Sequence, residues 1–453
     1  MTQRRNIGAT RRGFLTRAAG LAIAAPAIGA AVATPSVAKP GEAGTAARNR
    51  LTEPFWGKHQ AGIITPAQSH TYFIALDLTT TERNDLVRLL QAWTAAAARL
   101  ADGLPIEPFE RTDIDASYSI DTTKLVTTSE EPGSTKVTLP DTGDAVGLPA
   151  ARLTVTFGFG AGLFVKDGKD RYGLASRRPE ALIDLPHFVG DQLVEGNRDG
   201  DLSIQACADD PQVAFHAARQ LVRLADEVAQ VRWAQTGFLP DFGPDKTPRN
   251  LMGFRDGTNN PATGDAGLMN SVIWVGEEGP AWMRGGSYVI ARRIRIALEH
   301  WDRTPVAFQE QTVGRHKNSG APLGMMAEAD KLNLDMTDKD GNPLIAETAH
   351  VRLAAPETNN GAQILRRPYS YNDGVNFTAE RWPPWRQGSE YDAGLFFICY
   401  QRDPRTGFVR IYERMAKLDM MNQFVTHVGG GLFACPGGAT DGHYIGQGLF
   451  EGL

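Results

Sequence analysis

The order of apolar segments predicts an α+β fold built from two ferredoxin-like modules. In the first half, segments with strand and helix patterns follow one another as strand, helix, strand, strand, helix, the order of a split β-α-β unit. The second half repeats this order loosely. A chain of 453 residues is long enough for two or three domain-sized units. We therefore expect modules over residues 55–240 and 241–453, joined near 236–250, where Gly, Pro and Asp cluster.

In the first module, local composition marks where each element begins and what type it is. Residues 71–78 are short, aromatic and β-branched, which is typical of a buried strand. Asp210 and Pro211 supply an N-cap and a first helical residue, which together predict the start of a helix. The expected elements are strands over 71–78, 153–159 and 201–208, and helices from about 83 to 100 and from 211 to about 228.

The second module is expected to contain two strands and two helical segments. Residues 287–296 end in alternating Ile and Arg, and residues 394–401 are almost wholly apolar. Both patterns are typical of strands in a sheet. A short helix or turn is expected over 298–303 and a helix around 417–425.

Composition narrows the function classes. The formal charge of −5 argues against a nucleic-acid partner, which would favour a basic surface. The three cysteines, Cys207, Cys399 and Cys435, are far apart and form no C-x-x-C pair, so disulfides, a cysteine metal site and a thiolate–haem site all have little support. Two of them lie in strand-like apolar runs, where a buried apolar role is expected.

The first 38 residues resemble an export signal. Arg11 and Arg12 precede an apolar run, and Ser36-Val37-Ala38 supplies small residues for a cleavage site. A membrane anchor is the weaker alternative, because this run is shorter than the ~20 residues of a spanning helix. We expect a twin-arginine signal peptide over 1–38 and a polar linker over 39–54. This route exports folded proteins, so the Tat export machinery is an expected partner, and the destination is extracellular or periplasmic.

The segment from Gly253 to Pro261, with the sequence GFRDGTNNP, places Asp256 between two glycines in a run of turn formers. Gly, Asn and Asp tolerate unusual backbone angles, so an ordinary turn with a local hydrogen bond explains the pattern. A carboxylate held at such a turn can also face a cavity. The segment alone leaves both interpretations open.

Among the nine histidines, His350 stands in the most distinctive setting. It lies in a short segment that Pro356 interrupts, and a Leu-Arg-Arg triplet containing Arg366 follows 16 residues later. No second histidine lies four residues from His350 and no cysteine is near it, so a zinc site has little support.

Taken together, these motifs resemble those of the dye-decolourising peroxidase family, in family order over nearly all of the mature chain. The resemblance implies a DyP-type α+β barrel of two ferredoxin-like modules, in the dimeric α+β barrel superfamily. The leader suits the family's exported branch, which includes deferrochelatase-like peroxidases. The matching segments are Phe55–Ile63, Gly253–Gly257, Gly285–Tyr288, Glu310–Arg315, Ala349–Arg352, Leu365–Arg367 and Asp392–Phe397.

The resemblance implies one haem b per chain, with His350 as the proximal iron ligand. Asp392 would accept a hydrogen bond from the other ring nitrogen of His350 and so fix its tautomer, although a strand-start cap explains Asp392 equally well. Asp256 and Arg366 would lie on the distal side as acid–base group and charge stabiliser. Four further residues are implied around them: Asn260 beside bound peroxide, Leu395 and Phe397 as the apolar wall, and Arg315 against the cofactor.

The function so implied is the reduction of hydrogen peroxide with electrons from dyes, phenols or other organic donors. Because a haem pocket cannot admit a large dye, Trp382 and Trp385 are considered as surface electron relays, although simple packing explains both. The alternative is a deferrochelatase-like protein that releases iron from haem, and the motifs do not separate the two. A non-catalytic haem carrier is disfavoured by the presence of both Asp256 and Arg366. A homo-oligomer is compatible with the sequence.

Overall fold

The computed structural model describes residues 51–107, 141–240, 247–379 and 387–452. These residues belong to one compact unit, Ala47–Leu453. Among them, none of the helices combines the length and the apolar character that a membrane span requires. The expected signal peptide, most of the linker, Trp382 and Trp385 lie outside the described residues.

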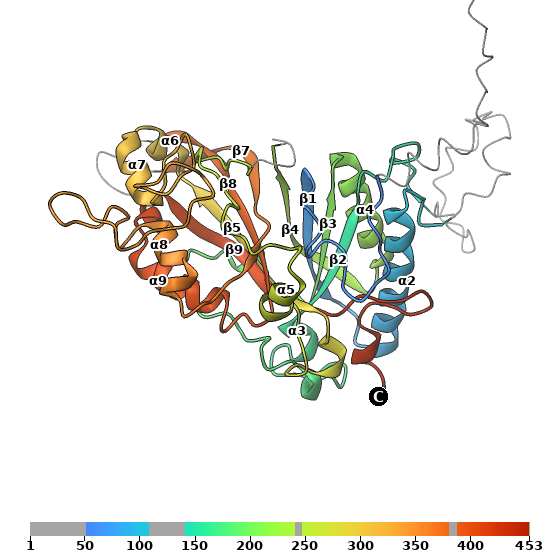
Figure 1. Cartoon of the computed structure of the whole chain (residues 1–453). Coiled ribbons are helices and arrows are strands. Elements are labelled where there is room, and N and C mark those ends of the chain that lie inside the picture. Colours follow the sequence, from blue (N-terminus) through green and yellow to red (C-terminus); the bar gives the residue numbers. More distant parts are fainter. Residues whose placement is uncertain (1–50, 108–140, 241–246, 380–386, 453) are drawn as a thin grey trace, which may run out of the picture. The chain divides into compact units, whose positions relative to one another are not determined.

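The described strands form a closed antiparallel β-barrel, as predicted for this fold (Figure 1). The ring runs β5-β9-β2-β3-β1-β4-β7-β8, and β8 pairs back to β5 with Ile290 opposite Cys399. The short strand β6 pairs with β8. The strands are β1 His70–Leu78, β2 Thr154–Gly160, β3 Leu202–Ala208, β4 Ala229–Phe238, β5 Ser287–Ile296, β6 Leu365–Arg366, β7 Tyr369–Ala379, β8 Gln387–Gln401 and β9 Val425–Cys435.

Two amphipathic helices cover the N-terminal strands. They are α2 (Arg83–Ala101) and α4 (Pro211–Leu224), and α4 packs on β1 and β3. Asp210 caps α4 as predicted, because its carboxylate accepts from the amides of Gln212 and Val213 at 2.7 and 3.1 Å. The Trp93 side chain joins the two helices by donating to the Leu221 carbonyl at 2.7 Å. The buried faces of both helices therefore form one layer over the barrel.

The C-terminal half contains short helices between its strands. They are α5 (Ala266–Val272), α6 (Leu298–Asp302), α7 (Val306–Val313), α8 (His350–Ala354) and α9 (Phe408–Leu418). The helix expected around 417–425 is wrong: α9 ends at Leu418, a 3₁₀ turn covers Met420–Gln423, and β9 begins at Val425. The cause is Asp419, whose carboxylate accepts from the Met421 amide at 2.8 Å and caps the 3₁₀ turn.

Strand alternation separates the barrel interior from the cavity. On β8, Phe396, Ile398 and Tyr400 belong to the interior core, whereas Leu395 and Phe397 line the cavity outside it, because successive side chains of a strand point to opposite faces. Cys207 and Cys399 are buried, as expected, and Cys435 is buried as well. The fold thus uses the outer face of β5, β8 and β9 as one wall of the site.

Candidate active site

A large cavity lies between this outer face of the barrel and the helices α8 and α9. Its free space, counted out to the solvent at the open mouth, is about 1630 Å³. Most of its lining is apolar, including Ile294, Ile296, Val425, Leu395 and Phe397. The cavity therefore suits a mainly apolar ligand.

His350, the first residue of α8, lies in this cavity. Its Nδ1 is 2.7 Å from Oδ2 of Asp419, whose other oxygen accepts from the Met421 amide. Burial alone would lower the pKa of His350, but the neighbouring Asp419 carboxylate outweighs burial and raises that pKa. The bond assigns a proton to Nδ1 and leaves Nε2 with the lone pair that can bind a metal.

The structure corrects the prediction that Asp392 is the hydrogen-bond partner of His350. Asp392 accepts instead from Nη2 of Arg293 at 3.0 Å, in a surface ion-pair group that also contains Asp373. It does not line the cavity. Position along β8 explains this, since Asp392 precedes the part of the strand that reaches the cavity wall.

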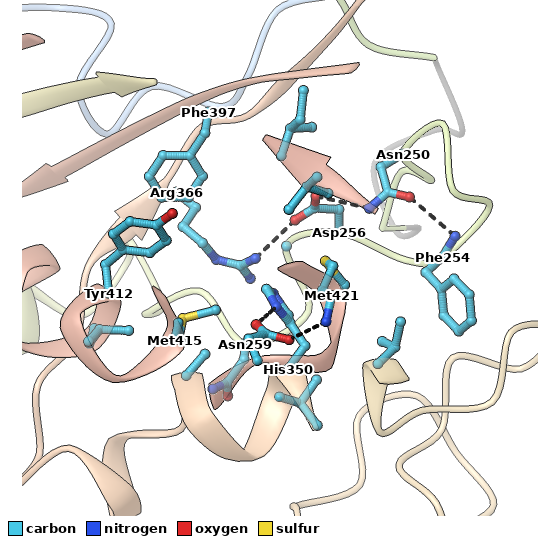
Figure 2. A pocket seen from close by; sticks show the side chains of 18 of the residues that line it. Asn250, Phe254, Asp256, Asn259, His350, Arg366, Phe397, Tyr412, Met415 and Met421 are labelled. Carbon is cyan, nitrogen blue, oxygen red and sulfur yellow. Dashed lines mark hydrogen bonds and ion pairs between the residues drawn. The ribbon is translucent and has the colours of Figure 1, made fainter. Parts of the chain in front are cut away.

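Asp256 and Arg366 meet in the same cavity as His350 and lie above it in the view of Figure 2. Arg366 donates from Nη1 to Oδ1 of Asp256 at 2.9 Å, and the Asn250 amide lies 3.4 Å from Oδ2. The two side chains are 26% and 12% exposed, so both face the cavity instead of being sealed in the core. The acid is thus held at both oxygens and kept within reach of a ligand.

Two glycines shape the turn that carries Asp256. Gly253 has φ +84° and Gly257 has φ +123°, which are angles that L side chains rarely adopt. The turn is closed by backbone bonds from Gly253 to the Asn250 carbonyl and from Asn250 to the Phe254 carbonyl. The glycines therefore let the chain reverse so that Asp256 points into the cavity.

Asn260 positions Arg366 and does not line the cavity that contains His350. Its Nδ2 donates to the Arg366 carbonyl at 2.8 Å, and its Oδ1 accepts from the Arg366 amide at 3.2 Å. Because both ends of the side chain are engaged, the expected contact of Asn260 with bound peroxide has no support in this geometry. The residue instead fixes the short strand β6 against the turn that bears Asp256.

The other expected site residues all line the cavity. Leu395 and Phe397 form part of the wall contributed by β8. Arg315 is 7% exposed and donates to the carbonyls of Gly320 and Glu328 at 2.8 and 3.0 Å. Burial and the neighbouring Arg366 lower the pKa of Arg315, although Glu328 opposes them. An anionic ligand group near Arg315 would relieve this crowding of positive charge.

Sequence reasoning missed several residues of the cavity. Asp419 and Asn250 hold His350 and Asp256, and Asn259, Tyr412 and His427 also form part of the lining. His427 lies on β9, where its Nδ1 accepts from Nε of Arg292 at 3.1 Å. Asp419 follows directly on a helix end, and no local signal links it to a histidine 69 residues earlier.

The donor set fits haem. An imidazole with a free lone pair, an apolar lining and cationic side chains are what a planar iron porphyrin with acidic substituents requires. An α+β barrel that brings such a histidine together with an aspartate–arginine pair in one cavity defines a haem-binding oxidoreductase.

Comparison with known proteins specifies the family. The Dyp-type peroxidase N-terminal and C-terminal models match residues 60–239 and 247–440. The chain is 38% identical to a dye-decolorizing peroxidase of Thermobifida fusca, covering 87% of this chain and 84% of that protein. It is 35% identical to a deferrochelatase of Yersinia pseudotuberculosis, covering 91% and 88%. A DyP-type peroxidase structure from Streptomyces coelicolor superposes with a TM-score of 0.75 at 39% identity, covering 89% and 99%. This chain belongs to the Dyp-type peroxidase family, whose members are haem enzymes that use hydrogen peroxide.

Proposed function

We propose that this chain is an exported peroxidase that reduces hydrogen peroxide with electrons from dyes, phenols or other organic donors, using one haem b per chain. The observation that supports this most strongly is the Asp256–Arg366 ion pair in the cavity that also contains His350. Within this proposal, Nε2 of His350 would bind the haem iron. Leu395 and Phe397 would pack against the porphyrin, and Arg315 would supply positive charge for its carboxylates.

When bound, the haem supplies the iron at which the peroxide O–O bond breaks and which then withdraws electrons from the donor. Asp256 performs the proton chemistry beside it. Its carboxylate takes a proton from one peroxide oxygen and returns a proton to the oxygen that leaves as water. A group that acts first as base and then as acid must lie within hydrogen-bond reach of both oxygens, and the bonds from Arg366 and Asn250 hold Asp256 in one orientation.

Arg366 contributes charge and position. Its guanidinium remains charged at any working pH, and it stabilises the negative charge that develops on the departing oxygen. Asn260 holds the Arg366 backbone at both its N–H and its C=O. The positive charge is therefore already in place before the ligand arrives, which avoids the cost of reorganising it during the reaction.

The test separates peroxidase activity from iron release. Purified holoprotein is mixed with peroxide and a phenolic donor, and oxidised donor, free iron and free porphyrin are measured together. We expect donor oxidation while the iron stays bound to the porphyrin. Release of iron with intact porphyrin would instead support the function named by the deferrochelatase relatives. A carrier would be indicated if the wild type showed neither donor oxidation nor release of iron.

Donor access and export are separate parts of the proposal. Replacing Trp382 and Trp385 by Phe should slow the oxidation of a bulky dye but not that of a small phenol, if these residues relay electrons. Equal dye turnover would remove them from the proposal.

Replacing Arg11 and Arg12 by Lys should leave the protein in the cytoplasm, as followed by cell fractionation. Unchanged export of this double variant would contradict the twin-arginine route.

A further inference from the structure

The sulfur of Cys207 lies inside the barrel among polar groups, although an apolar role was expected for this residue. Cys207 is fully buried on β3. Its Sγ lies 3.3 Å from Nε2 of Gln205, 3.3 Å from Oγ1 of Thr71 and 3.5 Å from the hydroxyl oxygen of Tyr369. Each of these three groups carries a hydrogen that it can donate. The sulfur is therefore surrounded by hydrogen-bond donors.

The orientation of the Gln205 amide is set by a second contact. Its Oε1 accepts from the Tyr400 hydroxyl at 2.5 Å, so the NH₂ end of the amide faces the Cys207 sulfur. A neutral thiol is a weak acceptor, whereas a thiolate accepts strongly from several donors at once. The donors around Cys207 therefore favour a negative charge on its sulfur.

Arg367 is a buried cation in the same part of the barrel. It directly follows the cavity residue Arg366 but is only 5% exposed. Its guanidinium donates to the Thr65 carbonyl and, at 2.7 Å, to Oε1 of Gln68, and its buried Nε has no hydrogen-bond partner among the described residues. Both bonds go to neutral groups. A buried charge without a counter-charge costs several kcal/mol, so a negative group is needed close to Arg367.

Three ionisable groups act most strongly on the Arg367 charge, and one of them is suited to ionise. They are the Cys207 thiol and the phenols of Tyr369 and Tyr400. Burial raises the pKa of Tyr369 and of Tyr400 well above the usual value of a phenol, so both remain protonated. A thiol ionises at a lower pH than a phenol, ~8.5 against ~10, and a neighbouring guanidinium favours its thiolate.

We propose that Cys207 is ionised and that its thiolate forms a buried ion pair with the Arg367 guanidinium inside the barrel. Arg366 and Arg367 are consecutive and lie on opposite sides of the chain, one in the haem cavity and one in the barrel. The ion pair holds this segment from the inside, which makes Cys207 a positioning residue for Arg366. That role rests on the proposed peroxidase function, whereas the ion pair does not.

The test is infrared spectroscopy of the S–H stretch in the holoprotein, because a thiol gives this band and a thiolate does not. Burial raises the pKa of Cys399 and of Cys435, so both are thiols. Cys399→Ala and Cys435→Ala should each remove part of the S–H intensity, and the double variant should remove all of it. Cys207→Ser should remove none. A residual S–H band in the double variant, or a loss of intensity in Cys207→Ser, would overturn the proposal.

A pair of variants at position 207 tests the need for a negative charge. Cys207→Asp restores that charge, and Cys207→Asn has the same size but is neutral. The Asp variant should melt at the higher temperature and react faster with peroxide, because Arg367 keeps a counter-charge. An Asp variant that melts at or below the temperature of the Asn variant would overturn the ion pair, and equal peroxide rates would overturn the positioning role. A wild type that does not react with peroxide would contradict the proposed function, while the infrared result would still decide the ion pair.

Discussion

Single residues show most directly how the cavity fixes its chemistry, and Asp419 is the clearest case. It is nearly buried, and its two oxygens join Nδ1 of His350 to the amide that begins the next 3₁₀ turn. A carboxylate on the far nitrogen makes an imidazole a stronger ligand. Asp419 therefore determines both the orientation of His350 and the electron density that it can give to a metal.

Asp419→Asn should weaken haem binding or slow the peroxide reaction by ~10–100-fold, because the amide keeps the hydrogen bond but removes the negative charge. It should also raise the reduction potential of the bound haem, measured by redox titration. Asp392→Asn is the matched control, since that carboxylate pairs with Arg293 away from the cavity. Equal shifts in both variants, or none in either, would contradict the role given to Asp419.

At the residue scale, the site residues that could be predicted from the sequence are those that stand in a recognisable local motif. Asp256 stands in a turn motif, His350 in a segment with Pro356 close behind it, and Arg366 beside a second arginine. The structure brings all three to one cavity. Asp419 and His427 could not be predicted in this way, because their roles arise from contacts across 69 and 135 residues of chain.

At the scale of elements, the turn bearing Asp256 depends on backbone geometry. Gly253→Ala should destabilise the protein by about 1–2 kcal/mol, because an L-residue with a side chain is strained in the left-handed backbone conformation that Gly253 adopts. It should also lower activity by moving Asp256. Gly264→Ala is the control, since it has ordinary backbone angles and open space around it. Thermal unfolding and peroxide turnover measure both effects, and equal melting temperatures for the two variants would disprove the strain argument.

The elements that sequence analysis found are those with strong periodicity, such as β1, α2, β3 and α4. The strand β9 was missed because three consecutive glycines, Gly429 to Gly431, interrupt its apolar pattern. The strand β4 was also missed, because its outward-facing residues are exposed and its apolar pattern is therefore weak. Its conformation comes from pairing with β1 on one side and β7 on the other. Both strands take their conformation from barrel pairing more than from local preference.

At the scale of the whole molecule, the segment that contains Asp191 and the α9 residue Tyr412 cover Arg292 on the outer face of β5, where it lies next to His427 of β9. Arg292 donates to both oxygens of Asp191 at 2.6 Å and to His427. Burial first, and then the Arg292 charge, hold the pKa of His427 well below its usual value. The histidine therefore stays neutral in the folded protein.

This neutral histidine predicts a loss of stability in acid. As the pH falls below about 6.5, His427 becomes protonated in the unfolded chain but stays neutral in the folded protein. The stability present above that pH is then lost at up to about 1.4 kcal/mol per pH unit until the folded pKa is reached. His427→Gln keeps an acceptor for Arg292 but cannot titrate, so its melting temperature should fall less than that of the wild type between about pH 7 and about pH 5. Parallel falls in the two proteins would contradict this assignment.

The central claim is that Asp256 and Arg366 act on peroxide in the cavity where His350 holds the haem. The most direct test is the rate at which peroxide changes the haem absorbance in stopped-flow mixing, compared between wild type and Asp256→Asn. We expect a fall of ~10²–10⁴-fold at the same haem content, because the general acid–base group is lost. A rate equal to that of the wild type in Asp256→Asn, with haem fully bound, would contradict it.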